Sequence, residues 1–356
     1  MNNFNIFMSF VKLGLLASIG KRYSNFKIFF EDLKNKKLLN NKEYFVKVKK
    51  YIDSKQYNID RLYFEVSNVC NAKCIFCAYK SISKNPHHKN GIMDFKIFKK
   101  AVNDAIDMNI KKISLTPTIG DPLVDPNIFE KIEYIKKNES IYGYFYTNGL
   151  FLNKNENYKK IVDSGINELD ISTAGFDKKN WEKIFGVDAY KTHLLGLSNL
   201  LKYAKERKSN IKININLRTN LNPIRIFFQK DFKNYILPHL TTKVNFTYMY
   251  TYDNWGGAIQ KHDLLSGMIL RRAYTFKRIP CKRLFDASIL FDGSVRLCAC
   301  RAIETEFDDL VIGNIKKASL ESIFYGEKAQ NIRRSFLDGK YPKTCRECSM
   351  YVPLKI

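Results

Sequence analysis

The sequence lacks several features that would assign it to a simple structural class. No uninterrupted apolar run reaches the roughly 18 residues of a membrane-spanning helix, and no repeat recurs at a solenoid period. No positive charge precedes the apolar N-terminal stretch, so an export signal is not predicted. Hydrophobic residues are 45% and charged residues 27% of the 356 residues, which excludes disorder for the bulk of the chain.

Cysteine is also scarce, with eight residues in the chain. Secreted disulfide scaffolds are short and rich in cysteine, so disulfides are not expected. The cysteines form two clusters instead, three between residues 70 and 77 and five between residues 281 and 348. Such tight spacings are typical of metal sites, which need reduced thiolates, so a cytoplasmic protein is expected.

Arginine is infrequent although the formal net charge is +25. The 60 basic residues are 46 Lys and 14 Arg, and they are spread along the chain. A selected phosphate-binding surface would favour the forked arginine side chain, so nucleic acid is not the expected partner. Anionic small substrates or anionic lipid head groups would also suit the charge.

Residues 1–60 predict an N-terminal helical extension with lysine-rich faces. Its apolar stretch from Phe4 to Ile19 is followed by Lys21 and Arg22. This pattern predicts a helix that packs on the domain. The alternative is a peripheral membrane contact through an interfacial helix.

Residues 61–255 alternate short β-branched or aromatic runs with longer amphipathic segments. Tandem β-α units predict an α/β fold with a parallel sheet, and six units are too few for a closed eight-stranded barrel. A partial (β/α)6 TIM-like barrel is therefore expected, with its active site at the C-terminal ends of the strands. The predicted strands are Leu62–Ser67, Lys112–Thr116, Tyr142–Tyr146, Glu168–Ser172, Ile211–Leu217 and Lys243–Tyr250, and the predicted helices are Phe95–Met108, Asn127–Lys137, Tyr158–Ser164, Tyr190–Lys208 and Ile226–Tyr235.

Residues 256–356 predict a small C-terminal α+β domain. The pair Asp292-Gly293 favours a hairpin turn between the strand-like runs Ala287–Phe291 and Ser294–Cys298. A predicted helix, Leu320–Phe336, and a short tail with two cysteines follow.

The first cysteine cluster has the spacing Cys-x3-Cys-x2-Cys at Cys70, Cys74 and Cys77, directly after the first predicted strand. A structural zinc site would need a fourth ligand close by, and the nearest histidines, His87 and His88, lie in a polar loop. Three thiolates on a four-iron cluster leave one iron without a protein ligand. An open iron is a place for chemistry.

The segment Cys70 to Cys77, with the aromatic Phe76 before its last cysteine, resembles the motif of the radical S-adenosylmethionine (radical SAM) superfamily. The resemblance spans about residues 61–250. It implies a SAM-binding [4Fe-4S] cluster that chelates SAM and, once reduced, splits it into methionine and a 5′-deoxyadenosyl radical. That radical takes a hydrogen atom from an unreactive C–H bond, and an electron donor such as flavodoxin or ferredoxin is implied.

Segments at the ends of later strands match the same family. Ile119-Gly120-Asp121-Pro122-Leu123 resembles the family's Gly-Gly-Glu-Pro segment, which binds the methionine amino group, with Ile119 and Asp121 as departures. The resemblance implies cofactor contacts at Phe76, Gly120, Asp121, Pro122, Asn148, Ser172 and Arg218.

The second cluster resembles the SPASM extension found in many radical SAM enzymes. Its four cysteines can enclose an auxiliary [4Fe-4S] cluster with no open site. The full extension carries seven cysteines, so five fit the shortened, single-cluster twitch form better, and Cys300 is left as an alternative ligand, a redox thiol or a buried residue. A basic zinc-ribbon nucleic-acid-binding protein is the alternative of another class, but it would leave the first cluster unexplained. The predicted auxiliary ligands are Cys281, Cys298, Cys345 and Cys348.

The substrate is expected between the two clusters. Ala299 stands where sulfatase-maturating members have a catalytic Asp, and residues 1–60 do not resemble a peptide-recognition domain. A radical SAM oxidoreductase that oxidises or epimerises a small molecule, including sugar derivatives, is therefore predicted, and a peptide- or protein-modifying maturase is the alternative. The candidate catalytic residues are Glu65, Tyr248, Tyr250, Asp253 and Arg296.

Overall fold

The computed structural model describes residues 3–39, 41–298 and 308–356. Its strands are β1 (Leu62–Phe64), β2 (Lys112–Ser114), β3 (Tyr142–Thr147), β4 (Glu168–Thr173), β5 (Lys212–Arg218), β6 (Val244–Met249), β7 (Thr251–Tyr252), β8 (Ile269–Leu270), β9 (Ala287–Ile289), β10 (Ser294–Leu297) and β11 (Val311–Asn314). Its α-helices are α1 (Asn3–Leu39), α2 (Lys42–Ser54), α3 (Tyr79–Ile82), α4 (Phe95–Asp107), α5 (Ile128–Lys136), α6 (Asn157–Asp163), α7 (Lys178–Phe185), α8 (Tyr190–Glu206), α9 (Pro223–Phe227), α10 (Leu320–Phe324), α11 (Glu327–Ser335) and α12 (Lys343–Arg346).

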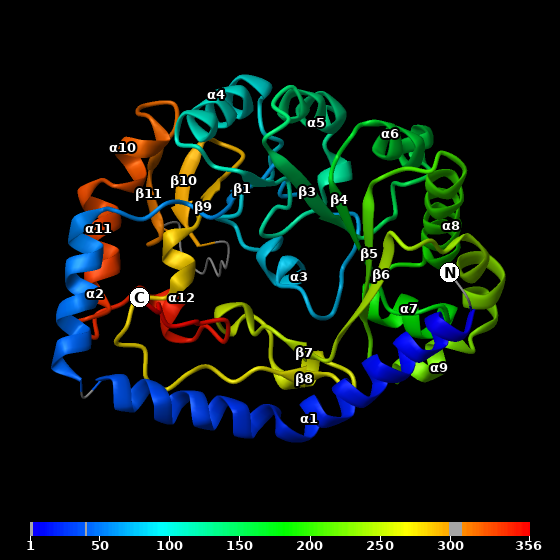
Figure 1. The fold of residues 1–356 in the computed structure, drawn as a ribbon, viewed down its shortest axis with the longest axis horizontal. Coiled ribbons are helices and arrows are strands. Elements are labelled where there is room, and N and C mark those ends of the chain that lie inside the picture. The colour runs from blue at the N-terminus through cyan, green and yellow to red at the C-terminus, as the bar shows by residue number, and fades with distance from the viewer. Residues whose placement is uncertain (1–2, 40, 299–307) are drawn as a thin grey trace.

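A nine-stranded sheet runs through the molecule in the order β11-β10-β9-β1-β2-β3-β4-β5-β6. Strands β1 to β6 are parallel, and each pairs with the next along the chain. Helices α4, α5, α6 and α8 lie along the convex outer side of the curved sheet (Figure 1). The six predicted strands and the partial (β/α)6 barrel are therefore confirmed.

Strand alternation separates an apolar outer face from a polar inner face. In β4, Leu169 and Ile171 are fully buried against the helices, and in β5 Ile213 and Ile215 are buried in the same way. Successive side chains of a strand point to opposite faces, so the residues between them face the inside of the barrel. These inward residues are Glu168, Asp170, Ser172, Lys212, Asn214, Asn216 and Arg218.

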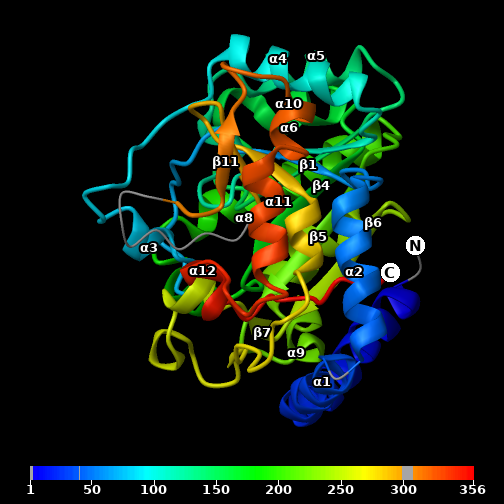
Figure 2. The ribbon, with the colours of Figure 1, turned by 90° about the vertical axis from the view of Figure 1, so that its left-hand side faces the viewer.

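The C-terminal hairpin joins the barrel sheet instead of forming a separate one. The predicted hairpin is confirmed as the antiparallel pair β9–β10, and β9 also pairs in parallel with β1, with Leu62 opposite Ala287. Figure 2 shows β11 and helices α10 and α11 on this side of the barrel. One sheet therefore crosses the predicted boundary at residue 255; the divisions at residues 60 and 255 remain predictions.

Two predicted helices differ from the structure at their ends. The helix expected at Ile226–Tyr235 begins earlier as α9, because Asn222 caps it by accepting a hydrogen bond from the Ile224 N–H (2.9 Å). It ends at Phe227, and a separate π-helical segment, Phe232–Ile236, covers the second part of the predicted range. The helix expected at Leu320–Phe336 is divided into α10 and α11 by Gly326. Helix α7 was not predicted; Asp177 caps it through the Asn180 N–H (2.9 Å).

Helix α1 runs along the lower edge of the molecule in Figure 1. Phe10 is fully buried, and its ring lies 5.7, 5.3 and 4.8 Å from the ring centres of Phe227, Phe232 and Phe246. The predicted packing of this helix on the domain is therefore confirmed. The segment Asn3–Lys21 is also long and apolar enough to cross a membrane, although core helices and signal sequences pass the same test, so this is weak evidence.

Candidate functional site

Cys70, Cys74 and Cys77 lie in the loop that follows β1, where the C-terminal ends of the parallel strands meet. Burial, together with the nearby Asp121 and Cys77, raises the pKa of Cys70 to about 12. Burial, Cys77 and Cys70 likewise raise the pKa of Cys74. Burial thus opposes ionisation of all three thiols, and this donor set fits a positively charged iron cluster that would bind them as thiolates.

The end of helix α7 is hydrogen-bonded to the backbone of the cysteine loop. The Lys73 and Ile75 N–H groups donate to the carbonyls of Phe185 (2.9 Å) and Ile184 (3.0 Å) at the end of this helix. Gly186 follows with φ 68°, and a Cβ there would lie 2.5 Å from the Lys73 carbonyl oxygen. Only glycine fits this approach, so the end of α7 fixes the backbone between two of the thiols.

The Gly120-Asp121 segment packs against the part of the same loop that precedes Cys70. Gly120 has φ 115°, and a Cβ there would lie 2.5 Å from the Ser67 carbonyl oxygen. The Asp121 N–H donates to the Val69 carbonyl (2.9 Å), directly before the first cysteine. The predicted cofactor residue Gly120 therefore allows the two loops to approach closely, with Pro122 buried behind it at the start of a short 3-10 turn.

The carboxylate of Asp121 contacts the protein itself. It accepts hydrogen bonds from the Asn148 N–H (2.7 Å), the Thr147 hydroxyl (3.0 Å) and the Leu123 N–H (3.0 Å). Burial raises its pKa, while these three donors lower it. Asp121 thus positions Asn148 instead of presenting an open carboxylate.

Asn148 lies against the first cysteine. Its side-chain amide donates to the Asn71 Oδ1 (2.6 Å) and lies 3.6 Å from the Cys70 sulfur. Its carbonyl is 2.9 Å from Nδ1 of His193, a buried residue of α8 that sequence reasoning missed. Burial lowers the pKa of His193 to about 4, so the ring is neutral and holds the Asn148 loop in place.

Three predicted cofactor residues from different elements meet at the open side of the thiols. The Arg218 Nε donates to the Ser172 hydroxyl (3.0 Å), and its guanidinium lies 5.3 Å from the Phe76 ring centre. The positive charge of Arg218 also counters the upward shift in the pKa of Cys74 and Cys77. This arrangement places a cation beside the cysteine loop, as the binding of a carboxylate would require.

The inner wall of the barrel carries a carboxyl group that sequence reasoning missed. Asp170 is buried, one of its oxygens accepts from the Asn216 side chain (3.0 Å), and the other accepts no hydrogen bond from the residues that the structure describes. Burial and neighbouring Glu168 raise the pKa of Asp170 to about 6. The signal was present, because Asp170 precedes Ser172 by two residues and must face the same side of β4.

The candidate catalytic residues on β1 and after β6 are placed as follows. Glu65 is buried beyond the end of β1. The Tyr248 and Tyr250 ring centres lie 6.1 Å apart at the end of β6, and Lys21 of α1 donates to the Tyr248 hydroxyl (3.3 Å). Burial raises the pKa of Tyr248 to about 12, so it is protonated at neutral pH.

The other two candidate catalytic residues, Asp253 and Arg296, form hydrogen bonds to residues of the C-terminal region. Asp253 accepts from the Ser349 hydroxyl (2.7 Å). Arg296 is fully buried, pairs with Asp308 (2.7 Å) and donates to the Cys298 carbonyl (2.5 Å). These contacts give both side chains a bracing role.

The four predicted auxiliary ligands come together from two distant parts of the chain. Cys281, Cys298, Cys345 and Cys348 line one small cavity, whose other walls include Leu284, Leu310, Phe336 and Tyr351. Backbone N–H groups of Val352 and Met350 point at the sulfurs of Cys281 (3.4 Å) and Cys348 (3.3 Å). Hydrogen bonds to sulfur of this kind are usual around iron-sulfur clusters, so the residues fit the expected group.

Lys277 holds this second site together and was not predicted. Its side chain is almost fully buried, and its ammonium donates to the carbonyls of Cys345 (2.7 Å), Arg346 (2.7 Å) and Cys348 (3.0 Å). Cys298 adopts φ 67°, a conformation that non-glycine residues rarely take. The buried cation Lys277 and the strained backbone of Cys298 thus both lie at the second cysteine site.

Some sequence predictions cannot be placed. Ala299 and Cys300 lie outside the described residues. Across the part of the chain that is described, no three His, Cys, Asp or Glu side chains form a group that would hold a single metal ion. The fit of the two cysteine sites to clusters therefore rests on the shared cavity and on the donor sets.

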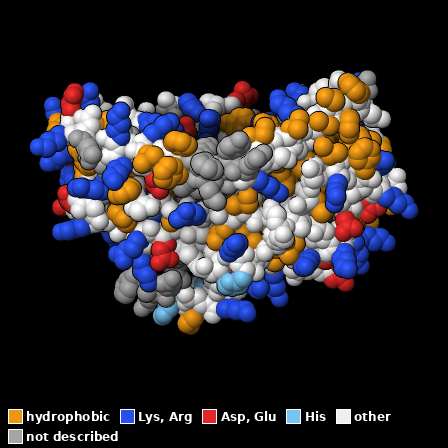
Figure 3. Space-filling view, turned by 90° about the horizontal axis from the view of Figure 1, so that it is seen from below, with side chains coloured by type: hydrophobic (Ala, Val, Ile, Leu, Met, Phe, Trp, Pro, Cys, Tyr) orange, Lys and Arg blue, Asp and Glu red, His pale blue; other side chains and the backbone are white. Residues whose placement is uncertain are grey.

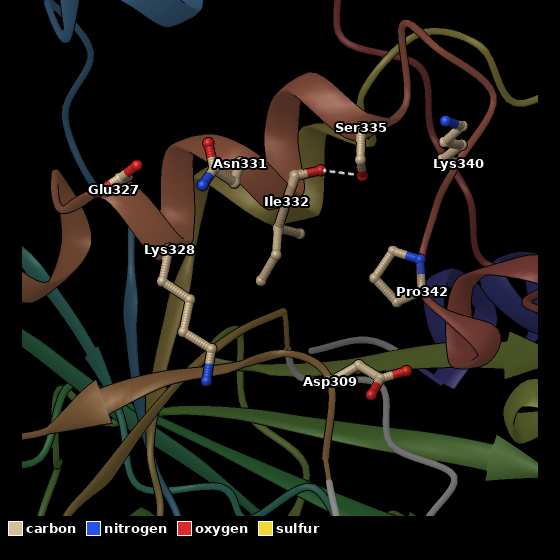
Figure 4. A pocket seen from close by; sticks show the side chains of 8 residues that line it. All are labelled: Asp309, Glu327, Lys328, Asn331, Ile332, Ser335, Lys340 and Pro342. Carbon is tan, nitrogen blue, oxygen red and sulfur yellow. Dashed lines mark hydrogen bonds between the residues drawn. The ribbon is translucent and has the colours of Figure 1, made fainter.

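A different pocket, of about 520 Å³, opens on the surface beside α11 (Figure 4). Ser335 in its wall donates to the Ile332 carbonyl of the same helix (2.8 Å). The pocket contains no cysteine, and we assign it no role. It is lined by Asp309, Glu327, Lys328, Asn331, Ile332, Ser335, Lys340 and Pro342.

Comparison with known families matches both parts of the chain. The model of the radical SAM superfamily matches residues 64–223, and that of an iron-sulfur cluster-binding domain, SPASM, matches residues 281–349. GTP 3′,8-cyclases of Thermodesulfovibrio yellowstonii and Desulforamulus reducens are 30% and 33% identical over 135 and 124 residues, or 37% and 34% of this chain. These alignments cover only 40% and 36% of the relatives' own length.

Solved structures share the fold at low identity. A BtrN complex with AdoMet and 2-DOIA superposes with a TM-score of 0.53 at 17% identity, over 82% of this chain and 92% of BtrN. Streptococcus suis SuiB bound to its precursor peptide SuiA gives a TM-score of 0.55 at 15% identity, over 83% of this chain and 72% of SuiB. At these identities the likeness concerns the fold alone.

Proposed function

Because the chain belongs to the radical SAM superfamily and carries a C-terminal SPASM domain, we propose that it abstracts hydrogen from a C–H bond of a polar small molecule. Its cofactors are SAM, a SAM-binding [4Fe-4S] cluster and an auxiliary iron-sulfur cluster. When bound, the first cluster supplies the electron that divides SAM into methionine and a 5′-deoxyadenosyl radical. Oxidation or epimerisation of the substrate is the outcome we propose.

The observation that carries the substrate class is the polar inner wall of the barrel. The interior of a closed TIM barrel is filled by layers of bulky aliphatic side chains. Here the inward positions of β4 and β5 hold Glu168, Asp170, Ser172, Asn216 and Arg218, which lead to the cysteine loop. Buried polar side chains need hydrogen-bond partners, so this wall suits a substrate rich in hydroxyl, amine or carbonyl groups.

We propose the following roles for the residues around the first site. Cys70, Cys74 and Cys77 hold the cluster, and Arg218, oriented by Ser172, binds the carboxylate of SAM. Gly120 and Asp121 keep the loop closed against the cysteines, and Asn148 positions Cys70. Asp170, two residues from Ser172 on the same face of β4, binds a hydroxyl or amine of the substrate.

The names of the relatives add a specific substrate to test. GTP 3′,8-cyclases act on a nucleotide by name, and their similarity to 135 and 124 residues of this chain favours a small polar substrate over a peptide. We place the enzyme in the cytoplasm, with flavodoxin or ferredoxin as its electron donor, because its thiolate ligands need reducing conditions.

The experiment is anaerobic turnover of the reconstituted protein with SAM and dithionite. 5′-Deoxyadenosine should form, and GTP, amino sugars and model peptides are then compared as added substrates in deuterated form. Deuterium in 5′-deoxyadenosine from a nucleotide or sugar would support the proposal. Transfer from a peptide alone would establish the maturase alternative, and iron-loaded protein that never cleaves SAM would overturn both.

A further inference from the structure

Helix α1 exposes large apolar side chains on the face that does not pack against the barrel. Leu15, Leu16, Ile19, Phe29 and Phe30 are each more than half exposed. Met8 and Leu33 are nearly half exposed. Soluble proteins rarely display so many large apolar groups on one element, so this face is a candidate binding surface.

These side chains form one stripe along the helix. Leu15 and Phe29 are 14 residues apart, as are Ile19 and Leu33, and Met8 precedes Leu15 by 7. Such intervals return to the same side of an α-helix, opposite the buried Phe10. Figure 3 shows the hydrophobic side chains gathered on the underside of the molecule, with Lys and Arg side chains around them.

The charge of the same segment has one dominant sign. Helix α1 contains seven Lys or Arg residues and two acidic residues, and helix α2 next to it adds four lysines and two acidic residues, Glu43 and Asp53, within Lys42–Ser54. Lys12, Lys34, Lys36 and Lys37 are exposed on the same helix, and Lys12 and Lys37 lie within the apolar stripe, 7 residues before Ile19 and 7 residues after Phe30. A partner for this face must therefore offer both an apolar interior and negative charge.

We propose that α1 docks this protein on the surface of an anionic phospholipid membrane. A helix of this kind lies in the plane of the interface, with apolar side chains below the head groups and lysines among the phosphates. The stripe is the convex side of a single helix, so it offers no groove for a peptide helix. Two copies of this basic face would repel each other, which disfavours a dimer as the occupant.

The docking face lies close to the open end of the barrel. A Cβ on Gly20 of α1 would come within 1.7 Å of the Tyr250 hydroxyl, so the helix presses on the chain directly after β6. The next residue, Lys21, donates to the Tyr248 hydroxyl (3.3 Å). Figure 1 shows α1 beneath β7 and β8, on the side toward which the parallel strands end, so docking would bring this end of the barrel to the membrane.

The test is co-sedimentation of the reconstituted full chain with vesicles. Phosphatidylcholine vesicles are compared with vesicles that contain about 30% phosphatidylglycerol, at low and high salt. Binding should occur on the anionic vesicles and fall with salt. Leu15→Glu combined with Ile19→Glu should lower the partition coefficient by tenfold or more, because both charges would enter the apolar layer.

The matched control is Ile106→Glu, which places the same charge on an exposed apolar residue of α4, away from the stripe. It should bind vesicles like the unchanged protein, and iron content and circular dichroism confirm that the variants stay folded. Equal binding to neutral vesicles, or full binding by the double variant, would overturn the proposal. So would a dimer that the double variant dissociates in the absence of any vesicle binding.

This readout is independent of the proposed reaction. In solution with dithionite, the double variant should form 5′-deoxyadenosine at the rate of the unchanged protein, since neither residue lies at the cysteine loop. Failure of vesicle binding with SAM cleavage intact would remove only the docking proposal.

Discussion

The two cysteine sites of this chain differ in what surrounds them. The first has three thiols in one loop at the end of β1, with the partly exposed Arg218 and Ser172 beside it and a polar wall leading away from it. The second has four thiols around a small cavity walled by apolar side chains, and its ligand segments are tied by the buried cations Lys277 and Arg296.

This difference predicts that the first site binds SAM and carries out the reaction, and that the second site supports it. Three ligands leave one position of a four-iron cluster for a substrate-like molecule, and the surrounding cation and polar groups can bind its charged ends. Four ligands in an apolar enclosure leave no such position. We therefore expect the second cluster to accept or pass electrons, or to hold the C-terminal part of the chain against the barrel, and not to bind SAM.

The largest effect is expected from removing one thiol of the first site. Cys74→Ala should abolish 5′-deoxyadenosine formation, because the cluster that binds SAM loses a ligand. Chromatography of the products with dithionite and SAM checks this result. Lys80→Ala, an exposed change just beyond the loop, should keep full activity; equal rates in the two variants would refute the assignment of the first site.

The second site should respond differently. Cys345→Ala combined with Cys348→Ala should remove about four iron atoms and stop product formation, while slow formation of 5′-deoxyadenosine continues. Iron analysis and product analysis of one preparation test this together. Loss of the iron with product formation unchanged would show that the second cluster is dispensable.

A smaller effect is expected from the lysine that braces the second site. Lys277→Met should leave three buried carbonyls without their donor, at a cost of about 1–3 kcal/mol for each one that finds no water. The variant should lose the auxiliary iron faster in the presence of a chelator and melt at a lower temperature. Lys317→Met, an exposed change, should do neither.

The smallest effect concerns pH. The pKa of Asp170 is about 6 in the folded protein, above its ordinary value near 4, so the folded state binds the extra proton between these two values. Its ionisation therefore lowers stability as pH rises from about 4 to 6, and Asp170→Asn should flatten this part of the stability profile.

The ionisation of Asp170 should also affect the rate of product formation. If Asp170 binds the substrate, product formation should change with an inflection near pH 6 that Asp170→Asn removes. Asp188→Asn, an exposed change, should keep the inflection. An unchanged profile in Asp170→Asn would assign Asp170 to the framework alone.

Much of this architecture could be predicted from the sequence, because strand runs and helical periods report burial directly. The six strands from Leu62 to Tyr250 were predicted in this way, whereas the two cysteine sites were predicted from the spacing of the cysteines and from the family resemblance. The pairing of β9 with β1 could not be, since Leu62 and Ala287 are 225 residues apart and their pairing depends on the assembled sheet. Buried braces such as Lys277 and His193 were missed because an isolated Lys or His in a sequence is most often solvated or packed.

Asp121 shows that a sequence motif does not determine the direction in which a side chain points. The resemblance predicts a carboxylate facing the methionine amino group, whereas the structure shows that carboxylate bound to the Asn148 and Leu123 N–H groups. The structure places this segment against the cysteine loop, but the direction of a side chain depends on neighbouring loops.

The central claim is that only one of the two clusters is open, and electron paramagnetic resonance of the reduced protein with and without SAM tests it directly. A variant with Cys70, Cys74 and Cys77 all replaced by Ala should keep about four iron atoms and a spectrum that SAM does not change. The Cys345→Ala, Cys348→Ala variant should keep the complementary cluster, with a spectrum that SAM shifts. A SAM-dependent shift in the triple variant, or none in the double variant, would contradict the account.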